Sequence, residues 1–112
     1  MPNDEEVGVA SYYTNDSVDP RWGGVTKSGE IFDETKMTAA VLPERWEELK
    51  GKKLKVTGLK TGQFVVVTVN DTGGFGKYGR SLDLSKAAFE QIANVANGLT
   101  DVKIEVVKDG NE

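Results

Sequence analysis

The stretch KKLKVTGLKTGQFVVVTVND, residues 52–71, decides the fold. Its two halves, 52–59 and 63–70, are rich in β-branched residues, and the tripeptide KTG separates them. This is the pattern of a β-hairpin with a glycine in its loop. Asp71 follows the second half directly. The stretch therefore predicts a hairpin that carries an acidic residue at its end.

Four further segments are predicted as strands, two of them by alternating β-branched or aromatic residues and two as short apolar segments. They are residues 7–13, 37–42, 81–84 and 101–107. The first of two expected helices covers 43–50, where Pro43 suits the first helical turn. The second follows Ser85, which has the side chain of an N-cap, and ends at Asn97-Gly98. The chain is therefore expected to be mainly β, with two short helices.

Length and charge limit the classes of protein to which the chain belongs. The 112 residues fit one compact domain, which we place at 7–107 between polar tails at 1–6 and 108–112. The formal net charge of −4 disfavours binding to a nucleic-acid backbone. No segment approaches the roughly 20 apolar residues that span a bilayer, so no membrane span is expected.

Cysteine and histidine are both missing from the whole chain. Without cysteine there is no disulfide, no thiolate nucleophile and no Cys-based zinc site. Without histidine the chain lacks the commonest general base and the commonest metal ligand. Any catalysis must therefore use carboxylates, hydroxyls, lysine or tyrosine, and we expect neither a metal nor a cofactor.

Residues 74–79, GFGKYG, match the G-x-G-x-x-G pattern of dinucleotide-binding loops. In those folds the glycines open a helix directly, so that the helix N–H groups face the pyrophosphate. Here the helix begins only after the predicted strand 81–84, and no alternation of strands and helices surrounds the motif. The motif is therefore interpreted as a turn between strands.

Three acidic residues are candidates for a functional site. Asp71 ends an apolar strand beside glycines, where an acid is held rigidly and stays reachable by a ligand. The alternative role for Asp71 is structural: in an Asx-turn its side chain accepts hydrogen bonds from the next backbone N–H groups. Asp83 lies between two leucines in SLDL, and its alternative is a cap on the following helix. Glu30 lies in the long polar loop 15–34, where a solvated charge is the alternative.

Aromatic residues in the predicted loops are candidates for stacking on sugar rings. Trp22 lies beside two glycines in the polar loop, and Phe75 and Tyr78 lie in the glycine-rich turn. Core packing is the alternative for each ring. It is the expectation for Trp46 and for one of the two tyrosines in 7–13.

The order of these motifs resembles the rare lipoprotein A-like domain of septal cell-wall lytic transglycosylases. TKSGEIFD, MTAA, VVVTVNDTGGF and DLSKAAF carry the similarity, which covers residues 8–107. The stretch GRSLDLSKAAFEQIANVANG also resembles the first domain of bacterial expansins, which loosen walls without cleaving them. The resemblance implies a six-stranded double-psi β-barrel.

The resemblance also implies roles for the acids, and we take Asp71, Asp83 and Glu30 as catalytic candidates. In the lytic transglycosylase family the acid of the VND motif, here Asp71, is a key catalytic residue, and the SGE glutamate, here Glu30, lines the groove. In expansins the LDLS aspartate, here Asp83, is essential. A histidine usually follows MTAA in the transglycosylases, where this chain has Val41. The residues expected to contact the substrate are Tyr13, Trp22, Ser28, Phe75 and Tyr78.

Three functions stay open. The first is cleavage of peptidoglycan glycan by lytic transglycosylation, in which Asp71 acts as general acid and base and no external water is needed. The second is expansin-like binding or loosening of a wall polysaccharide without cleavage. The third is inhibition of another protein, or interaction with one, in which the loop 15–34 protrudes as the binding element.

These functions share expectations about partners and location. The expected partner is peptidoglycan or a related polysaccharide, with no nucleic acid, and the expected state is a monomer. The expected location is the cell envelope or the outside of the cell. The first residues, MPNDEEV, do not have the basic and then apolar pattern of an export signal.

Overall fold

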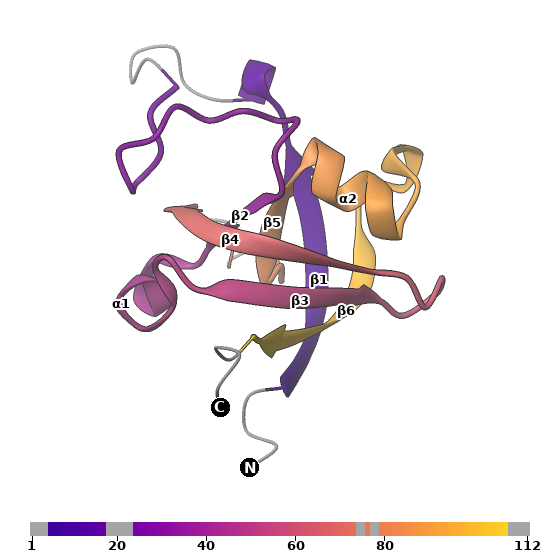
Figure 1. Ribbon diagram of the computed structural model, residues 1–112. Coiled ribbons are helices and arrows are strands. Elements are labelled where there is room, and N and C mark those ends of the chain that lie inside the picture. The colour runs from indigo at the N-terminus through magenta and orange to yellow at the C-terminus, as the bar shows by residue number, and fades with distance from the viewer. Residues whose placement is uncertain (1–4, 18–23, 74–75, 77–78, 108–112) are drawn as a thin grey trace.

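Six strands form a closed barrel in the computed structural model, which describes residues 5–17, 24–73, 76 and 79–107 (Figure 1). The strands are β1 (Glu5–Tyr13), β2 (Thr38–Val41), β3 (Lys53–Gly58), β4 (Phe64–Thr72), β5 (Leu82–Ser85) and β6 (Thr100–Val106). Around the barrel they follow the order β1-β5-β2-β4-β3-β6. The mainly β, six-stranded double-psi barrel with two short helices that the sequence predicts is thereby confirmed.

The barrel mixes parallel and antiparallel pairs. The pairs β1–β5 and β2–β4 are parallel, and the hairpin partners β3 and β4 are antiparallel. Parallel strands cannot be joined by a tight turn. The chain between β2 and β4, which contains α1 and β3, therefore has to cross over the barrel before it pairs with β2.

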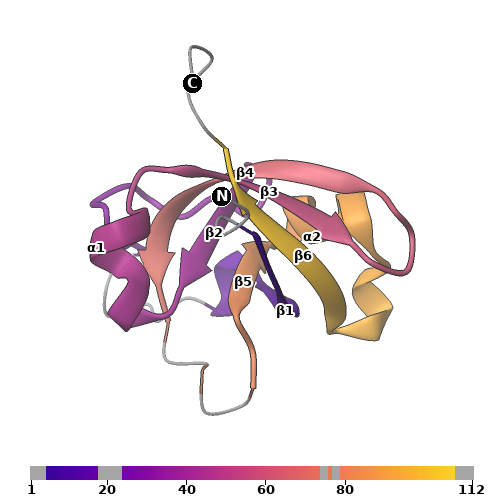
Figure 2. The same ribbon diagram turned by 90° about the horizontal axis from the view of Figure 1, so that it is seen from below.

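The two helices lie on opposite sides of the barrel in both views (Figure 1 and Figure 2). The first is α1 (Trp46–Leu49), which continues from a 3₁₀ turn at Pro43–Arg45. The second is α2 (Lys86–Ile92), in which the Ser85 side chain accepts a hydrogen bond from the Ala88 N–H at 3.3 Å. The predicted N-cap at Ser85 is therefore confirmed.

The second helix is shorter than its apolar pattern predicts. It ends at Ile92, because Ala93 adopts an extended backbone conformation. Asn94 then accepts a hydrogen bond from the Ala96 N–H at 2.9 Å and starts a separate 3₁₀ turn, Val95–Asn97. Asparagine side chains compete with the helix for backbone donors in this way.

Alternating residues of the strands fill the barrel interior. In β4 these residues are Val65, Val67 and Val69, and in β5 they are Leu82 and Leu84. Phe89 and Ile92 of α2 are fully buried against the same core. At Gly58 the strand and helix approach so closely that a Cβ atom would lie 2.6 Å from the Ile92 carbonyl oxygen.

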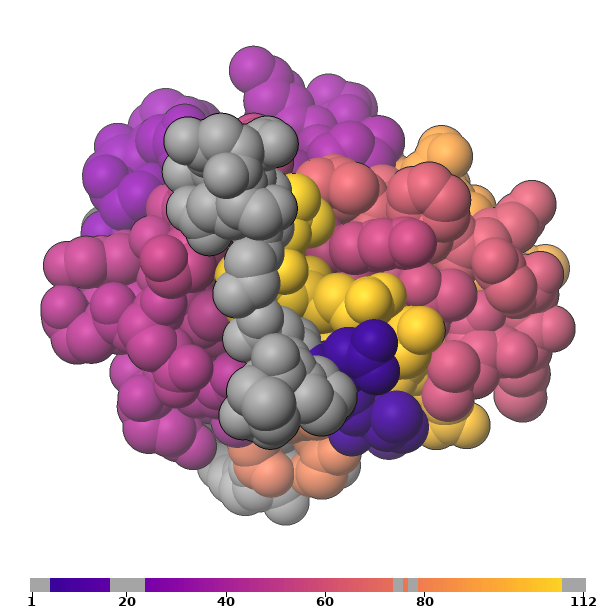
Figure 3. Space-filling view, turned by 60° about the horizontal axis from the view of Figure 1, so that its bottom comes forward, coloured from indigo at the N-terminus to yellow at the C-terminus, as the bar shows by residue number. Residues whose placement is uncertain are grey.

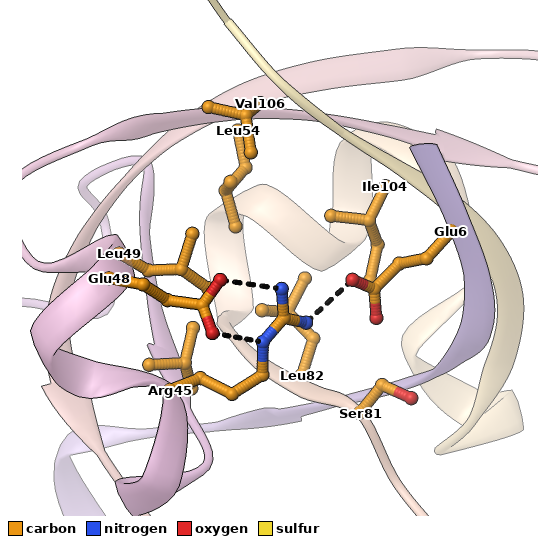
Figure 4. Close-up of a pocket in the computed structure, with 10 residues that line it drawn as sticks. Glu6, Arg45, Glu48, Leu49, Leu54, Ser81, Leu82, Ile104 and Val106 are labelled. Atoms are coloured by element: carbon orange, nitrogen blue, oxygen red, sulfur yellow. Dashed lines mark hydrogen bonds and ion pairs between the residues drawn. The ribbon is translucent and has the colours of Figure 1, made fainter. Parts of the chain in front are cut away.

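A small cavity of about 80 Å³ lies at one end of the barrel, between Leu54, Leu82 and Ile104 (Figure 4). Arg45 spans this end. Its guanidinium donates to Glu6 of β1 at 2.6 Å and to Glu48 of α1 at 3.3 and 3.4 Å. The ion pairs therefore join the first strand to the first helix.

The register between β2 and β4 shifts by one residue at a β-bulge. Ala39 pairs with Val69, but the next residue, Ala40, pairs with Asp71, so that Asn70 has no partner on β2. Bulges redirect side chains and are common next to functional sites. This bulge places Asp71 opposite Ala40.

Candidate functional site

Two carboxylates flank Ala40 on one face of the sheet. Ala40 of β2 pairs with Asp71 of β4 on one side and with Asp83 of β5 on the other. Asp83 in turn pairs with Ser11 of β1. Aligned residues on neighbouring strands point to the same face. We call Ser11, Asp83, Ala40 and Asp71 the acid row.

The dimensions of a sheet set the spacing in the acid row. Neighbouring strands lie about 4.8 Å apart, so the Cα atoms of Asp71 and Asp83, two strands apart, are separated by roughly 10 Å. Ala40, between the two acids, is only 3% exposed, and Ser11 at the end of the row is also buried. Asp71 and Asp83 are both partly exposed. A ligand group can therefore reach the row at the two carboxylates.

Asp71 is held by three hydrogen-bond donors. Its Oδ1 atom accepts from the backbone N–H groups of Lys27 and Thr72, both at 2.9 Å. Its Oδ2 atom accepts from the Tyr13 hydroxyl at 3.2 Å. The Asx-turn alternative accounts for only one of these contacts, because the Gly73 N–H donates to the Val41 carbonyl instead.

Asp83 is held from β1 and from the segment that precedes β5. The Ser11 hydroxyl donates to its Oδ1 atom, and Arg80 donates to the Ser11 oxygen at 2.9 Å. Burial raises the pKa of Asp83, although the Ser11 hydrogen bond and the Arg80 charge lower it; the charge of Asp71 raises it further. The helix-cap alternative for Asp83 is wrong, because Ser85 caps α2.

Tyr13 positions Asp71. Its ring stacks on Phe32, with ring centroids 4.2 Å apart, and its hydroxyl reaches the carboxylate. Burial raises the pKa of the Tyr13 hydroxyl well above its usual value, as do the charge and hydrogen bond of Asp71. The phenol therefore stays protonated and can donate to Asp71. The other tyrosine of β1, Tyr12, packs against Phe89 and fills the core role expected for one of the two.

Glu30 and Ser28 lie in a loop that is tied to the end of β4. Within this loop the Ser28 hydroxyl donates to the Glu30 carboxylate at 3.0 Å. The Asn70 amide of β4 also donates to Glu30, at 3.4 Å, and the Ser28 N–H donates to the Asn70 carbonyl at 3.1 Å. The loop thus brings Glu30 next to Asn70 and on the Asp71 side of the acid row.

Val41 lies inside the barrel. Its side chain is only 2% exposed and belongs to the buried core, and it also lines the cavity below Arg45. Ala40, which precedes it, belongs to the acid row instead. The residue after MTAA, where the family resemblance implies a histidine, therefore points away from the two carboxylates in this chain.

Three of the expected substrate contacts, Trp22, Phe75 and Tyr78, lie outside the described residues. Conversely, the sequence reasoning missed Ser11, Arg80 and the backbone of Lys27. Ser11 is two residues before Tyr13, so strand alternation places both on one face. That signal was available, but nothing local in the sequence connects Ser11 to Asp83, which is 72 positions away.

The described ranges contain neither a cluster of metal-binding side chains nor a membrane-spanning helix. Among those residues no three or more His, Cys, Asp or Glu side chains are grouped as metal ligands would be. No helix within them has the length and apolar character needed to cross a bilayer.

Comparison with known sequences gives consistent matches. A family model described as lytic transglycolase matches residues 5–104. An endolytic peptidoglycan transglycosylase RlpA of Vibrio cholerae is 40% identical over 104 residues, covering 91% of this chain and 35% of that protein. An uncharacterized protein of Synechocystis is 36% identical over 97 residues, covering 85% of this chain and 91% of that protein.

The chain spans only 25% and 29% of two further relatives, the probable endolytic peptidoglycan transglycosylases RlpA of Nostoc and Synechocystis. Their sequence identities to this chain are 37% and 38%. The similarity therefore concerns one part of each of these longer proteins.

Solved structures share the fold at lower identity. A mutant expansin of Clavibacter michiganensis in complex with cellohexaose has a TM-score of 0.72 at 23% identity, covering 94% of this chain and 51% of that one. A papain inhibitor of Streptomyces has a TM-score of 0.73 at 21% identity, covering 93% and 94%. At these identities the likeness concerns the fold alone.

Proposed function

Since the chain belongs to the lytic transglycolase family, we propose that it cleaves the glycan strands of peptidoglycan by lytic transglycosylation, at the cell envelope or outside the cell. The observation that carries the proposal is the acid row, in which two carboxylates from β4 and β5 flank Ala40 on one face. Glycoside cleavage requires a carboxyl group that protonates the leaving oxygen. The relatives named as transglycosylases support the choice of substrate.

The reaction needs a single carboxyl group that acts first as proton donor and then as proton acceptor. The bond between the anomeric carbon of the muramic sugar and the oxygen of the next sugar breaks, and the acid gives its proton to that oxygen. The 6-hydroxyl of the same muramic sugar then bonds to the anomeric carbon and returns its proton to the acid. The product is a 1,6-anhydro sugar, and no water is consumed.

We assign the acid and base role to Asp71, as the sequence predicts. Tyr13 and two backbone N–H groups fix the direction of its carboxylate, and the loop that contains Glu30 lies beside it. Such preorganisation is what a reacting group requires. Asp83 is the alternative proton donor, because burial raises its pKa and it keeps a proton at a higher pH than an ordinary carboxyl group.

Expansin-like binding without cleavage is the second candidate. The observation that favours it is Val41, which lies in the core at the position where the family resemblance implies a histidine. The inhibitor function has less support, because the described part of the loop is bound to its own barrel: the backbone N–H groups of Lys27 and Ser28 donate to Asp71 and to the Asn70 carbonyl of β4. A segment held in this way forms the wall of a groove.

Digestion of purified peptidoglycan tests the proposal. We expect anhydromuropeptides in the mass spectrum with the wild type, and their loss in Asp71→Asn. If Asp83→Asn loses the products while Asp71→Asn keeps them, the proton donor is Asp83. Binding to peptidoglycan in a pull-down without any products identifies the expansin-like function, and neither binding nor products contradicts both.

A further inference from the structure

Arg80 stands at the end of a chain of hydrogen bonds that reaches the acid row. Its guanidinium donates to the Ser11 oxygen at 2.9 Å, and the Ser11 hydroxyl donates to Oδ1 of Asp83. Ser11 belongs to β1, Asp83 to β5, and Arg80 to the segment that enters β5. Ser11 is only 3% exposed, so the middle of this chain is shielded from water.

The backbone is fixed on both sides of Arg80. Before it, Gly79 has a φ of 78°, a value that favours glycine, and its N–H closes a turn. After it, the Ser81 N–H donates to the Val9 carbonyl of β1 at 2.8 Å. β1 permits this approach because it carries Gly8, where a Cβ atom would clash with the Ser81 side chain. The Arg80 side chain therefore starts from a fixed place beside β1.

The Ser11 hydroxyl has its direction set by its two partners. A serine hydroxyl carries one proton and two lone pairs, whereas a guanidinium is always charged and can only donate. Arg80 therefore occupies a lone pair of the Ser11 oxygen. If Asp83 also donated to that oxygen, the buried hydroxyl proton would need another acceptor, and among the described residues its acceptor is Asp83. A buried donor without an acceptor is costly, so Ser11 keeps donating to Oδ1.

A proton that binds to Asp83 is thereby confined to Oδ2. Oδ1 lies against the buried Ser11, so the accessible side of this partly exposed carboxyl group is the side of Oδ2. We propose that Arg80 is a positioning residue of the site, which acts through the Ser11 hydroxyl to determine which oxygen of Asp83 can carry a proton. This role requires no contact between Arg80 and the substrate.

The charge of Arg80 acts on the same carboxyl group. Burial raises the pKa of Asp83, the Ser11 hydrogen bond and the Arg80 charge lower it, and the charge of Asp71 raises it. Tyr13 of β1 is the other titratable group that faces these acids, and it stays protonated. Arg80 therefore limits how far Asp83 competes with Asp71 as the proton donor, a consequence that rests on the proposed function.

NMR titration of the Asp83 carboxyl carbon tests the positioning role without any substrate. In Arg80→Met, which removes both the charge and the donor, Asp83 should titrate at a higher pH than in the wild type. Arg80→Lys keeps a charge and a donor, and in this variant Asp83 should titrate close to the wild type. A titration of Asp83 that Arg80→Met leaves unchanged overturns the proposal.

A double-mutant cycle with Ser11→Ala separates positioning from charge. The charge of Arg80 acts on Asp83 with or without Ser11, but the direction of the hydroxyl matters only when Ser11 is present. Arg80→Met should therefore raise the titration midpoint of Asp83 less in the Ser11→Ala background than in the wild type. Equal rises in the two backgrounds would give Arg80 a purely electrostatic effect and overturn its positioning role.

Lys103→Gln is the matched control for the loss of one positive charge. Lys103 lies on β6, which pairs with β1 and β3 and not with β5. Its side chain is partly exposed and pairs with Glu105 at 3.7 Å. Figure 3 shows β6 at the surface between the start of β1 and the β3–β4 hairpin. The titration of Asp83 should not change in this variant, and a rise equal to that in Arg80→Met overturns the proposal.

A measurement on the wild type decides if Arg80→Met does not fold. The Ser11 hydroxyl proton is buried and hydrogen-bonded, so it should give its own NMR resonance at low temperature. It should stay directed at Asp83 when the pH falls through the titration of that residue, because Arg80 holds the oxygen. A hydroxyl that turns away when Asp83 is protonated overturns the role.

Asp71→Asn separates this inference from the proposed function. This variant should lose the anhydromuropeptides but keep the effect of Arg80 on the titration of Asp83. If the wild type forms products and Arg80 has no effect on Asp83, the positioning role alone is overturned. If Arg80 has its effect and the wild type forms no products, the cleavage alone is overturned.

Discussion

Asp71 and Asp83 share one face of the sheet but meet different surroundings. Asp71 accepts from two backbone N–H groups and from a tyrosine whose proton is firmly held. Asp83 meets one hydroxyl and the charge of Arg80, and burial outweighs both in its pKa. Burial favours the protonated form of Asp83, which makes it the competitor for the proton-donor role assigned to Asp71. The comparison of Asp71→Asn with Asp83→Asn is therefore the measurement to make first.

The first prediction concerns the pH dependence of stability. Because the folded-state pKa of Asp83 is raised, the folded protein binds more protons than the unfolded chain between the ordinary and the raised value. Stability therefore falls as the pH rises through that window. Melting temperatures from pH 3 to 8 should show the wild type losing stability relative to Asp83→Asn above roughly pH 4. Parallel curves for the two proteins would contradict it.

The second prediction concerns Tyr13→Phe, which removes one donor to Asp71 and keeps the stacking on Phe32. Loss of a hydrogen bond to a charged group costs about 1.5 to 3 kcal/mol. If Asp71 is the reacting acid, the rate of anhydromuropeptide release should fall by about 10-fold or more, with glycan affinity unchanged. Tyr12→Phe is the control, because the Tyr12 hydroxyl donates to the Val95 carbonyl and not to an acid. An unchanged rate in Tyr13→Phe would assign that hydroxyl a purely structural role.

At the scale of elements, β2 is the strand on which the site depends. It runs between β4 and β5 and so joins the two acids, and its residues alternate between the barrel core and the face of the acid row. Ala39 and Val41 belong to the buried core, whereas Ala40 lies in the acid row. Substitutions at neighbouring positions of this strand should therefore have unrelated effects.

The third prediction uses this alternation. Val41→His would place an imidazole at the cavity below Arg45, which is lined by Leu54 and Leu82 and also by the polar side chains of Glu6, Glu48 and Ser81. A buried polar group without a partner costs roughly 1 to 3 kcal/mol, and a hydrogen bond to one of these side chains offsets part of that cost, so the free energy of unfolding in urea should fall by at most that amount. No gain in product release is expected, and a gain would show that a side chain at position 41 reaches the acids.

The fourth prediction concerns the start of α2. The Ser85 hydroxyl accepts from the N–H groups of Ala88 and Thr38 and donates to the Lys36 carbonyl, so it joins the helix to the segment before β2. Ser85→Ala should cost about 1 to 2 kcal/mol in urea unfolding. Asn94→Ala, which removes the cap of a single 3₁₀ turn, should cost less. Equal losses would show that Ser85 contributes only as a cap.

At the scale of the whole molecule, closure of the barrel leaves no unpaired strand edge among the six strands. Open edges are the usual route to association through strands. Apolar side chains do remain on the outer surface, among them Phe64 at 56% and Val7 at 70% exposure. They lie on different strands, and an ammonium group of Lys55 covers the Phe64 ring.

The fifth prediction is that the chain sediments as a monomer, because the closed barrel offers no strand edge for association. Sedimentation velocity over a hundredfold range of concentration should give the mass of a single chain throughout. Phe64→Ser provides the control for association through the outer face. A mass that doubles with concentration in the wild type and not in this variant would identify Phe64 as part of an interface.

Much of this fold could be read from the sequence, because its strands have strong local signals. The hairpin at 52–70, the N-cap at Ser85 and the last strand all follow from residue type and spacing. The candidate site could be predicted from the sequence only in part. Asp71 and Asp83 are marked by their motifs, but their common face depends on a bulge and on pairing between β2, β4 and β5, which no local pattern encodes.

The bulge at Asn70 also changes which residues of β4 face the core. Val65, Val67, Val69 and Asp71 are all odd-numbered, so uninterrupted alternation would turn Asp71 toward the interior with the valines. Because Asn70 is an extra residue in β4, Asp71 instead faces away from the core. Asp71, which the bulge turns away from the valines, can therefore be substituted with less effect on the core than Thr72, which pairs with the buried Val41.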